Sequence, residues 1–469
     1  FSVQPGNRTY TRKILFTGND ITQDQVLRRE MRQFEGAWTS DNAIEAGKVR
    51  LERLGYFKEV NVETIPVPGT DDQIDIIYNV DEETTGSIGG NIGYSDFGLM
   101  LGFNLQEQNF LGSGNTVGIG INKNIYSEMY NISYMNPYAT RDGVSLGYNL
   151  YFRETDYGEF NVANYLTNSN GFGAQFGYPI SDITRLGFNI TYDKTDIDVG
   201  SLPAREIYDF VSAEGNIFET LSAQLSWQRV TLNRGLFPTD GASTVLSFSS
   251  TIPGSDLSYY RLNVRQRYYQ PLTQNLVFGF QGELGYLNAY GDTEETPFFQ
   301  NFYAGGPRSL RGFESNTLGP RSTDAPCYEF NYAEGTCPNL LDIDGDGELD
   351  TPYYNPYANQ TSRYRDAPIG GNIKIEGSLQ LIFKLPFIED QRSLRSAFFF
   401  DFGNVFSDNC KEYQINCSEP SIDDLRYSYG VGITWITGFG PMSLAIAKPT
   451  NAGPRERTEE FQFTVGNVF

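Results

Sequence analysis

Histidine is absent from the 469 residues, and 35 Lys plus Arg are outnumbered by 58 Asp plus Glu. Without histidine, the chain has no Ser/His/Asp triad, no Cys/His nucleophile pair and no His-ligated zinc or haem. The net charge of −23 argues against nucleic acid as a partner, because clustered Lys and Arg hold phosphate backbones. These deficits remove most enzyme classes, and we expect a protein that is not an enzyme.

The sequence also lacks any run of about 18 apolar residues, which excludes a helical membrane span. It does not exclude a transmembrane β-barrel, whose strands need only about 9 to 11 residues of alternating polarity. The 49 glycines and the aromatic content of 14% favour a β-rich chain. Because the sequence starts at Phe1 without a signal peptide or initiator Met, we expect it to be a segment of a longer chain.

Cysteine is scarce and occurs in two close pairs, Cys327 with Cys337 and Cys410 with Cys417. Both pairs lie in loop-like stretches rich in Asn, Asp, Glu, Pro and Tyr. We predict two short-loop disulfides and an oxidising compartment outside the cytosol. Four free thiols remain the alternative, whereas a four-Cys zinc site would need closer spacings.

Residues 10–83 have the pattern of a small α+β module with the order β-α-α-β-β. Alternating polarity predicts a strand over 10–16, and Thr22 three residues before Gln25 predicts a capping box that opens a helix through 26–32. A second helix is predicted from Ser40, followed by two strands around a turn at 68–69. One stripe of the second helix is formed by Ile44, Gly47, Leu51 and Leu54, and Gly55 stands where its C-terminal cap belongs. The two strands are indicated by Val60 and Val62 and by Ile74, Ile76, Tyr78 and Val80. Its exposed edges make the module a docking unit.

After Glu83 the helical periodicity ends and period-two alternation continues to the C-terminus. Over residues 260–268, apolar side chains alternate with Arg and Asn, which fits a lipid-facing outside and a wet lumen better than a soluble sandwich. We predict a sixteen-stranded antiparallel transmembrane β-barrel. Its strands are expected at about 86–95, 98–108, 116–125, 128–136, 143–154, 168–179, 183–194, 216–230, 242–252, 258–270, 275–289, 371–386, 394–406, 426–437, 440–448 and 460–469.

The connections between these strands alternate between short turns and long loops, as expected of an outer-membrane barrel. Short turns such as 179–182 and 271–274 fall on the side of the N-terminal module. The long connections 195–215, 290–370 and 407–425 fall on the other side and hold every cysteine.

Four segments are specific when taken together and in order: VLRREMRQFEGAW (26–38), TGSIGGNIGYS (85–95), FYAGGPRSLRGFESNTLGP (302–320) and FQFTVGNVF (461–469). They resemble the BamA family of bacterial outer-membrane protein assembly factors, and the resemblance covers essentially the whole chain. It implies that residues 1–9 end a preceding POTRA domain, 10–83 form the last POTRA domain, and 84–469 form the barrel with a long extracellular loop at about 290–370.

The same resemblance implies a function and a location. Members of the family fold and insert other β-barrel proteins into the outer membrane of Gram-negative bacteria without ATP. The implied partners are unfolded outer-membrane proteins as substrates, accessory periplasmic lipoproteins docked on the POTRA domains, periplasmic chaperones and the lipid bilayer. The N-terminal domain is expected in the periplasm, and no cofactor is implied.

The first predicted barrel strand contains four glycines, Gly86, Gly89, Gly90 and Gly93, which weaken strand pairing. We therefore predict a weak lateral seam against the last strand. An open seam exposes N–H and C=O groups that are costly in lipid, so an incoming strand gains hydrogen bonds there. A bilayer thinned beside the seam would help. The alternative is that these glycines only relieve crowding in a closed barrel. The last strand contributes Phe461, Phe463, Gly466 and Phe469.

The long loop contains Arg311-Gly312-Phe313, and an arginine inside a barrel needs a charged partner. Strand parity places Asp401 on the lumen face, and Glu283 and Glu376 are further lumen candidates. In the family this arginine bonds acidic residues of the wall; Asp401 matches one, whereas the other falls where this chain has Gln380. We hypothesise that Arg311 and Asp401 hold the loop inside the barrel. The alternative is a surface arginine.

Residues 342–353 read DIDGDGELDTPY and resemble the start of an EF-hand calcium loop. Position twelve is Tyr353 instead of glutamate, and the flanking sequence is not helical. A calcium site and a solvated acidic turn therefore both remain open. The candidate ligands are Asp342, Asp344, Asp346, Glu348 and Asp350.

Two other functions deserve comparison. A two-partner-type secretion transporter shares POTRA domains, the barrel and an RGF-like loop, but passes a single exported protein outward. A passive porin would have neither a POTRA module nor a need for a weak first strand.

Overall fold

The computed structural model describes residues 8–95, 98–140, 142–158, 162–163, 165–199, 204–323, 329–331, 336–339, 367–385, 388, 393–411, 414, 417–437 and 440–466. The chain divides into two compact units, described separately below. The first comprises residues 1–89, 104–120 and 132–149, and the second comprises 90–103, 121–131 and 150–469. In the described part of the chain, no helix is long and apolar enough to cross a membrane.

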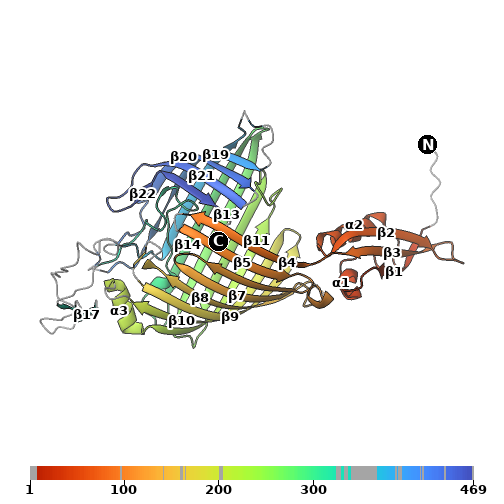
Figure 1. Ribbon diagram of the computed structural model, residues 1–469, viewed down its shortest axis with the longest axis horizontal. Helices are drawn as coiled ribbons and strands as arrows, with labels where there is room; N and C mark the ends of the chain where they lie inside the picture. Colours follow the sequence, from red (N-terminus) through yellow and green to blue (C-terminus); the bar gives the residue numbers. More distant parts are fainter. Residues whose placement is uncertain are drawn as a thin grey trace. The chain divides into compact units, whose positions relative to one another are not determined.

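The N-terminal module has the predicted β-α-α-β-β order. Its strands form a sheet in the order β1-β3-β2, in which β3 runs parallel to β1 and antiparallel to β2 (Figure 1). The elements are β1 (Tyr10–Thr17), α1 (Asp24–Arg28), α2 (Asp41–Arg53), β2 (Phe57–Pro66) and β3 (Gln73–Glu82).

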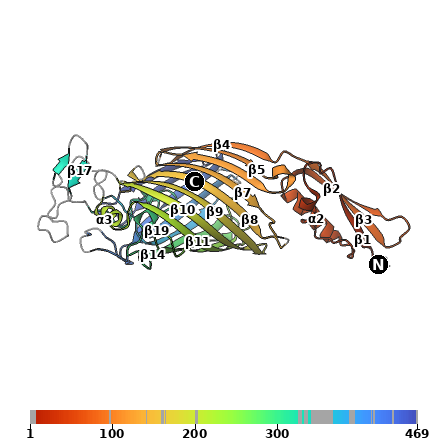
Figure 2. The same cartoon turned by 90° about the horizontal axis from the view of Figure 1, so that it is seen from below.

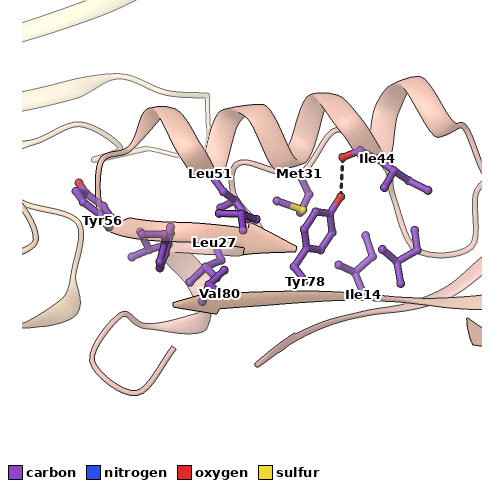
Figure 3. Packing of buried hydrophobic residues seen from close by; sticks show 12 residues of the cluster. Ile14, Leu27, Met31, Ile44, Leu51, Tyr56, Tyr78 and Val80 are labelled. Carbon is purple, nitrogen blue, oxygen red and sulfur yellow. Dashed lines mark hydrogen bonds between the residues drawn. The ribbon is translucent and has the colours of Figure 1, made fainter. Parts of the chain in front are cut away.

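Helix α2 follows its sequence signals closely. The Ser40 side chain accepts a hydrogen bond from the Ala43 amide at 3.4 Å, and Gly55 adopts a positive φ of 71° just beyond the helix. Ile44, Gly47 and Leu51 are buried on one stripe. The helix packs on the sheet, where the Tyr78 hydroxyl donates to the Ile44 carbonyl at 3.0 Å (Figure 3).

The capping box predicted for the first helix is wrong. Helix α1 is shorter than expected, and its N-cap residue is Gln23, whose side chain makes no capping bond. The Thr22 hydroxyl instead accepts a hydrogen bond from the Asn109 side chain at 2.8 Å, and the Glu82 carboxylate accepts from the Thr22 amide at 2.6 Å. Residues distant in sequence therefore bond the Thr22 groups that the local pattern predicted to cap the helix.

The second architecture is the predicted closed barrel of sixteen strands, seen as tilted arrows around one axis (Figure 2). Every neighbour in the ring pairs antiparallel, and the predicted strand positions hold, although several ends differ by a few residues. The strands are β4 (Gly86–Ser95), β5 (Gly98–Glu107), β6 (Thr116–Lys123), β7 (Ser127–Asn136), β8 (Ser145–Asp156), β9 (Tyr165–Ser181), β10 (Thr184–Val199), β11 (Ile217–Val230), β12 (Gly241–Thr251), β13 (Tyr259–Thr273), β14 (Leu276–Ala289), β18 (Ile373–Phe383), β19 (Leu394–Phe406), β20 (Arg426–Thr437), β21 (Gly440–Pro449) and β23 (Phe461–Val465).

The barrel wall reverses the usual distribution of polarity, because its apolar side chains point outward. Leu262 and Tyr268 on β13 are exposed on the outside, and Phe398 and Phe400 are exposed on β19. Between the last two, Phe399 points inward and is buried. This alternation is the one the sequence predicts for strands between lipid and a polar lumen.

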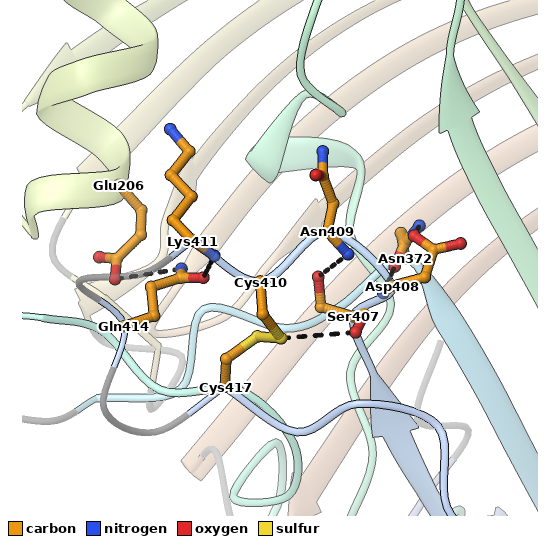
Figure 4. Close-up of a disulfide and its surroundings, with 9 residues drawn as sticks. All are labelled: Glu206, Asn372, Ser407, Asp408, Asn409, Cys410, Lys411, Gln414 and Cys417. Carbon is orange, nitrogen blue, oxygen red and sulfur yellow. Dashed lines mark hydrogen bonds between the residues drawn. A yellow bond between two sulfur atoms is a disulfide. The ribbon is translucent and has the colours of Figure 1, made fainter.

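The long connections carry additional structure at one end of the barrel, here called the loop end. Helix α3 (Arg205–Glu214) buries Ile207 and Phe210 against Phe218 and Phe298, in a cluster over the strand ends. The predicted disulfide between Cys410 and Cys417 is present (Figure 4). Side-chain contacts of the other predicted pair, Cys327 and Cys337, lie outside the described residues.

Between the two bridged cysteines, the Gln414 side chain donates to Glu206 on α3 at 3.2 Å. The Thr323 amide donates to the same carboxylate at 3.1 Å. Burial raises the pKa of Glu206 above its usual value, against the opposing effect of these hydrogen bonds. The carboxylate therefore joins three segments of the loop end.

Candidate functional site: the lumen loop and the seam

Residues 301–321, here called the lumen loop, turn back on themselves inside the barrel. The Gly306 amide donates to the Leu310 carbonyl at 3.1 Å, and the Gly305 amide donates to the Ser309 hydroxyl at 2.9 Å. The Ser309 hydroxyl in turn donates to the Glu376 carboxylate on the barrel wall. The turn is thus closed on itself and attached to β18.

Arg311 and Asp401 meet in a two-pronged ion pair. The guanidinium donates through Nε and Nη2 to the two carboxylate oxygens, each at 2.7 Å, and the Arg311 amide adds a bond of 3.2 Å. Asp401 is fully buried. Such paired, charge-assisted bonds fix both distance and orientation, so the loop is held at one point of the lumen.

Two further groups surround this arginine. Its Nη2 donates to the Ser378 hydroxyl at 3.0 Å, and its guanidinium lies 3.4 Å from the centre of the Phe399 ring. Gln380, at the position where the family resemblance implies an acid, bonds Ser378 through its side chain at 3.3 Å. Serine and an aromatic face therefore supply the contacts that a second carboxylate would otherwise provide.

The other two predicted acids do not contact Arg311 in the described part of the chain. Glu376 binds Ser309 and Lys374, whose ammonium lies 3.0 Å away. The Glu283 carboxylate accepts hydrogen bonds from the Asn263 side chain at 2.9 Å and from Arg265 Nε at 3.1 Å. Glu376 thus holds the loop through Ser309, whereas Glu283 neutralises cations of the wall.

Gly312 and Phe313 extend the attachment to the segment between β21 and β23. They form the short strand β15 (Gly312–Phe313), which pairs antiparallel with β22 (Thr458–Glu459). Gly312 has a φ of 90°, and a Cβ there would come within 3.1 Å of the Ala447 side chain. Phe313 is fully buried beside Leu310 and Leu318 of the same loop.

Sequence reasoning missed one residue that links the loop to the last strand. Gln462 on β23 is buried; its side chain donates to the Phe313 carbonyl at 2.8 Å and accepts from the Gly312 amide at 3.3 Å. The signal was present, because a glutamine between Phe461 and Phe463 must face the lumen. The last strand therefore carries a side chain that binds the lumen loop through two hydrogen bonds.

The seam between β23 and β4 is the junction at which the last strand of the barrel meets the first. Among the described residues, these strands are in register only where Val465 lies opposite Tyr94. By contrast, β9 and β10 pair from Ser181 opposite Thr184 to Tyr165 opposite Val199, with one register shift directly after Thr184. Because each ladder pair contributes backbone hydrogen bonds, the described residues contribute fewer such bonds to this junction than to the one between β9 and β10.

A glycine on each strand shapes the crossing at the seam. Gly466 has a φ of 82°, and a Cβ there would lie 2.6 Å from the Ile92 carbonyl oxygen. A Cβ on Gly93 would lie 3.0 Å from the Val465 carbonyl oxygen. The other predicted glycines, Gly86, Gly89 and Gly90, lie along β4 before this point.

Exposed apolar side chains line both strands of the seam. Ile88, Ile92 and Tyr94 are exposed on β4, and Phe461 is exposed on β23, with Phe463 half-buried. A short ladder flanked by such side chains can offer backbone groups to another strand in lipid. Phe469, the remaining residue of the predicted seam, lies outside the described residues.

The predicted calcium ligands, Asp342, Asp344, Asp346, Glu348 and Asp350, also lie outside the described residues. Within the described ranges, His, Cys, Asp and Glu form no group of three or more that could hold a metal ion.

Comparisons with known proteins place both parts of the chain. A family model described as the Omp85 superfamily domain matches residues 109–469, and the POTRA model, described as a surface antigen variable number repeat, matches residues 9–83. The outer membrane protein assembly factor BamA of Neisseria meningitidis serogroup B is 29% identical over 496 residues, which cover 100% of this chain and 57% of that protein. The chain thus spans little more than half the length of this relative.

Solved structures give the same picture. The crystal structure of BamA from Haemophilus ducreyi lacking POTRA domains 1–3 superposes with a TM-score of 0.80 at 32% identity, covering 98% of this chain and 85% of that one. CdiB from Escherichia coli has a TM-score of 0.59 at 12% identity, covering 98% of this chain and 76% of that one, a likeness of fold alone. These similarities indicate an outer-membrane protein.

Proposed function

Because the chain belongs to the Omp85 superfamily, we propose that it is part of an outer-membrane assembly factor that folds and inserts β-barrel proteins. The observation that carries this proposal is the seam between β4 and β23, where the described residues give one register pair, between Val465 and Tyr94. An unfolded strand arriving in lipid has unpaired backbone groups, and a strand edge that is easily freed satisfies them without ATP. The seam then acts as a template.

The lumen loop supports this mechanism by fixing the strands near the seam. Arg311 ties the loop to β19, while Gln462 ties it to β23. Thus β23 is attached to the lumen loop as well as to its neighbour β21. We infer that the seam opens by release of β4, so that β23 stays in place.

The partners proposed are those of an assembly factor: unfolded outer-membrane proteins as substrates, with periplasmic chaperones and accessory lipoproteins acting through the POTRA domain. The N-terminal module is proposed to lie in the periplasm, and no cofactor takes part. Exposed side chains such as Phe34 and Trp38 give that module an apolar surface for docking.

A pair of engineered disulfides tests the template directly. Tyr94→Cys with Val465→Cys bridges the seam, and Ala174→Cys with Ile190→Cys bridges β9 and β10 at another register pair. We expect the first bridge alone to stop insertion of an unfolded barrel protein into proteoliposomes, and reduction to restore it. Equal insertion by both oxidised variants would refute the template.

Depletion of the full-length protein in its own cell tests the wider role. If it is a general assembly factor, several unrelated outer-membrane barrels should fall together. If those barrels hold steady while one secreted protein is lost, the two-partner-type transporter is the correct function.

A further inference from the structure

A cavity of about 740 Å³ lies in the lumen near the short turns, at the end of the barrel opposite the loop end. It is bounded by the turn 231–240 and by the adjoining ends of β13, β14, β18 and β19. Its volume falls within the range of about 300–1,000 Å³ that is usual for small-molecule sites.

The walls of this cavity are mainly apolar. Phe237 and Pro238 come from the turn, and Val277 and Ile382 come from the strands. Phe237 adopts a φ of 50°, which is unusual for a residue with a large side chain. The turn is thus shaped so that an aromatic ring lines the cavity.

The charges around the cavity are all of one sign. Arg234, Lys384 and Arg395 line it, and its described lining contains no carboxylate, although the whole chain has a net charge of −23. Arg234 Nη2 bonds the Thr239 hydroxyl at 3.2 Å. Such a concentration of cations in an acidic chain favours an anionic ligand.

Arg395 gives the clearest sign of a missing partner. Its Nη2 is buried without a hydrogen-bond partner among the described residues, while its guanidinium lies 4.9 Å from the centre of the Tyr269 ring. A buried guanidinium nitrogen without an acceptor is costly, and a carboxylate or phosphate oxygen would satisfy it.

From these observations we propose that the cavity binds a single-chain anionic amphiphile, a fatty-acid carboxylate. The head group bonds Arg395, with Lys384 adding charge, and the acyl chain lies against Phe237, Val277 and Ile382. Because the described lining is mainly apolar and carries cations but no carboxylate, the cavity favours an acyl anion over a neutral lipid or a cation.

The proposed cavity adjoins the contacts that hold the lumen loop. Phe237 and Arg395 line a second, smaller cavity of about 230 Å³, which is also lined by Arg311 and Gln462. A bound acyl anion would therefore share wall residues with the groups that hold the loop. This inference does not rest on the proposed assembly function, because it is argued only from the residues that line the cavity.

The test uses the full-length protein in lipid nanodiscs and dodecanoate with a diazirine at its far end. Its methyl ester serves as the uncharged probe. We expect the carboxylate to label residues 231–240 and 271–277 after irradiation, and excess unlabelled dodecanoate to suppress the labelling. The double variant Lys384→Gln with Arg395→Gln should bind at least about tenfold more weakly, because it removes the charge-assisted bond to Arg395, and one such bond is typically worth more than about 1.4 kcal/mol.

Arg267→Gln is the matched control, since it removes a cation from β13 that does not line the cavity. Thr273→Trp, which fills the rim without altering charge, should also reduce labelling. Equal labelling by acid and ester, or unchanged labelling of the double variant, would overturn the proposal. So would displacement of the probe by a peptide with a free carboxyl terminus where dodecanoate fails to displace it.

Discussion

The POTRA module and the barrel hold their internal segments in place by different interactions. The module relies on apolar packing, whereas the barrel uses an ion pair and hydrogen bonds in its lumen. The module buries Leu27, Leu51 and Tyr78 in an ordinary apolar core against its sheet. The barrel points many apolar side chains outward, and its lumen loop is fixed by the Arg311–Asp401 pair and by hydrogen bonds beside a smaller apolar cluster that includes Phe313. Lipid outside the barrel removes the driving force that water supplies to the module.

The difference shows where each part is vulnerable. An apolar core loses stability in proportion to the volume removed, and its neighbours partly relax. Loss of one partner of a buried ion pair is strongly destabilising, because it leaves an uncompensated buried charge. The position of the lumen loop should therefore depend on very few residues.

Removal of Arg311 should give the largest effect. Arg311→Ala leaves Asp401 buried and unpaired, and we expect a loss of about 3–5 kcal/mol in the stability of the barrel. Urea unfolding in lipid vesicles measures this loss, and growth of cells that depend on the variant measures its consequence. Arg265→Ala is the control, because its side chain is 62% exposed and its pair with Glu283 should contribute about 0–1 kcal/mol. Normal assembly and growth with Arg311→Ala would contradict the hypothesis that this residue holds the loop.

A cavity in the POTRA core should follow. Leu51 is fully buried, and Leu51→Ala should destabilise the module by about 2–5 kcal/mol. The control is Ile65→Ala on the edge strand β2, where the side chain is 45% exposed and the effect should be small. Limited proteolysis of residues 10–83 distinguishes the two variants. If Leu51→Ala also released the lumen loop, the contrast between the two regions would be lost.

Loss of Gln462 should have an intermediate effect. Gln462→Leu removes a donor and an acceptor and leaves the Gly312 amide and the Phe313 carbonyl unsatisfied, at a cost of about 1–3 kcal/mol for each group that stays buried. Thr464→Val, on the same face of β23, is the control. Hydrogen exchange at Gly312 reports the contact directly. Unchanged protection there would show that β15 is held by β22 alone.

Much of this arrangement could be predicted from the sequence. Period-two alternation located the barrel strands, and the same parity placed Asp401 in the lumen. The contacts of Arg311 with Ser378 and Phe399 could not be predicted, because they depend on the height at which a long loop enters the lumen. The cap at Thr22 failed for a similar reason, since Asn109 and Glu82 come from distant positions. The alternation of polarity predicts which face of a strand a side chain occupies. To predict its partners from distant segments, the relative positions of those segments must also be known.

The smallest expected effect concerns Glu206 at the loop end. Among the described residues, this buried carboxyl group has no ionic partner comparable to Arg311, the partner of Asp401. Burial raises the pKa of Glu206, so its neutral form is favoured in the folded state. The stability it contributes is therefore fully present below its ordinary pKa and is lost as pH rises through the raised value. Glu206→Gln mimics the neutral form. We expect the ratio of wild-type to variant cleavage rates at the loop end to increase between pH 5 and pH 8, since the ratio cancels the pH dependence of the protease. A constant ratio would mean that Thr323 and Gln414 compensate the buried charge completely.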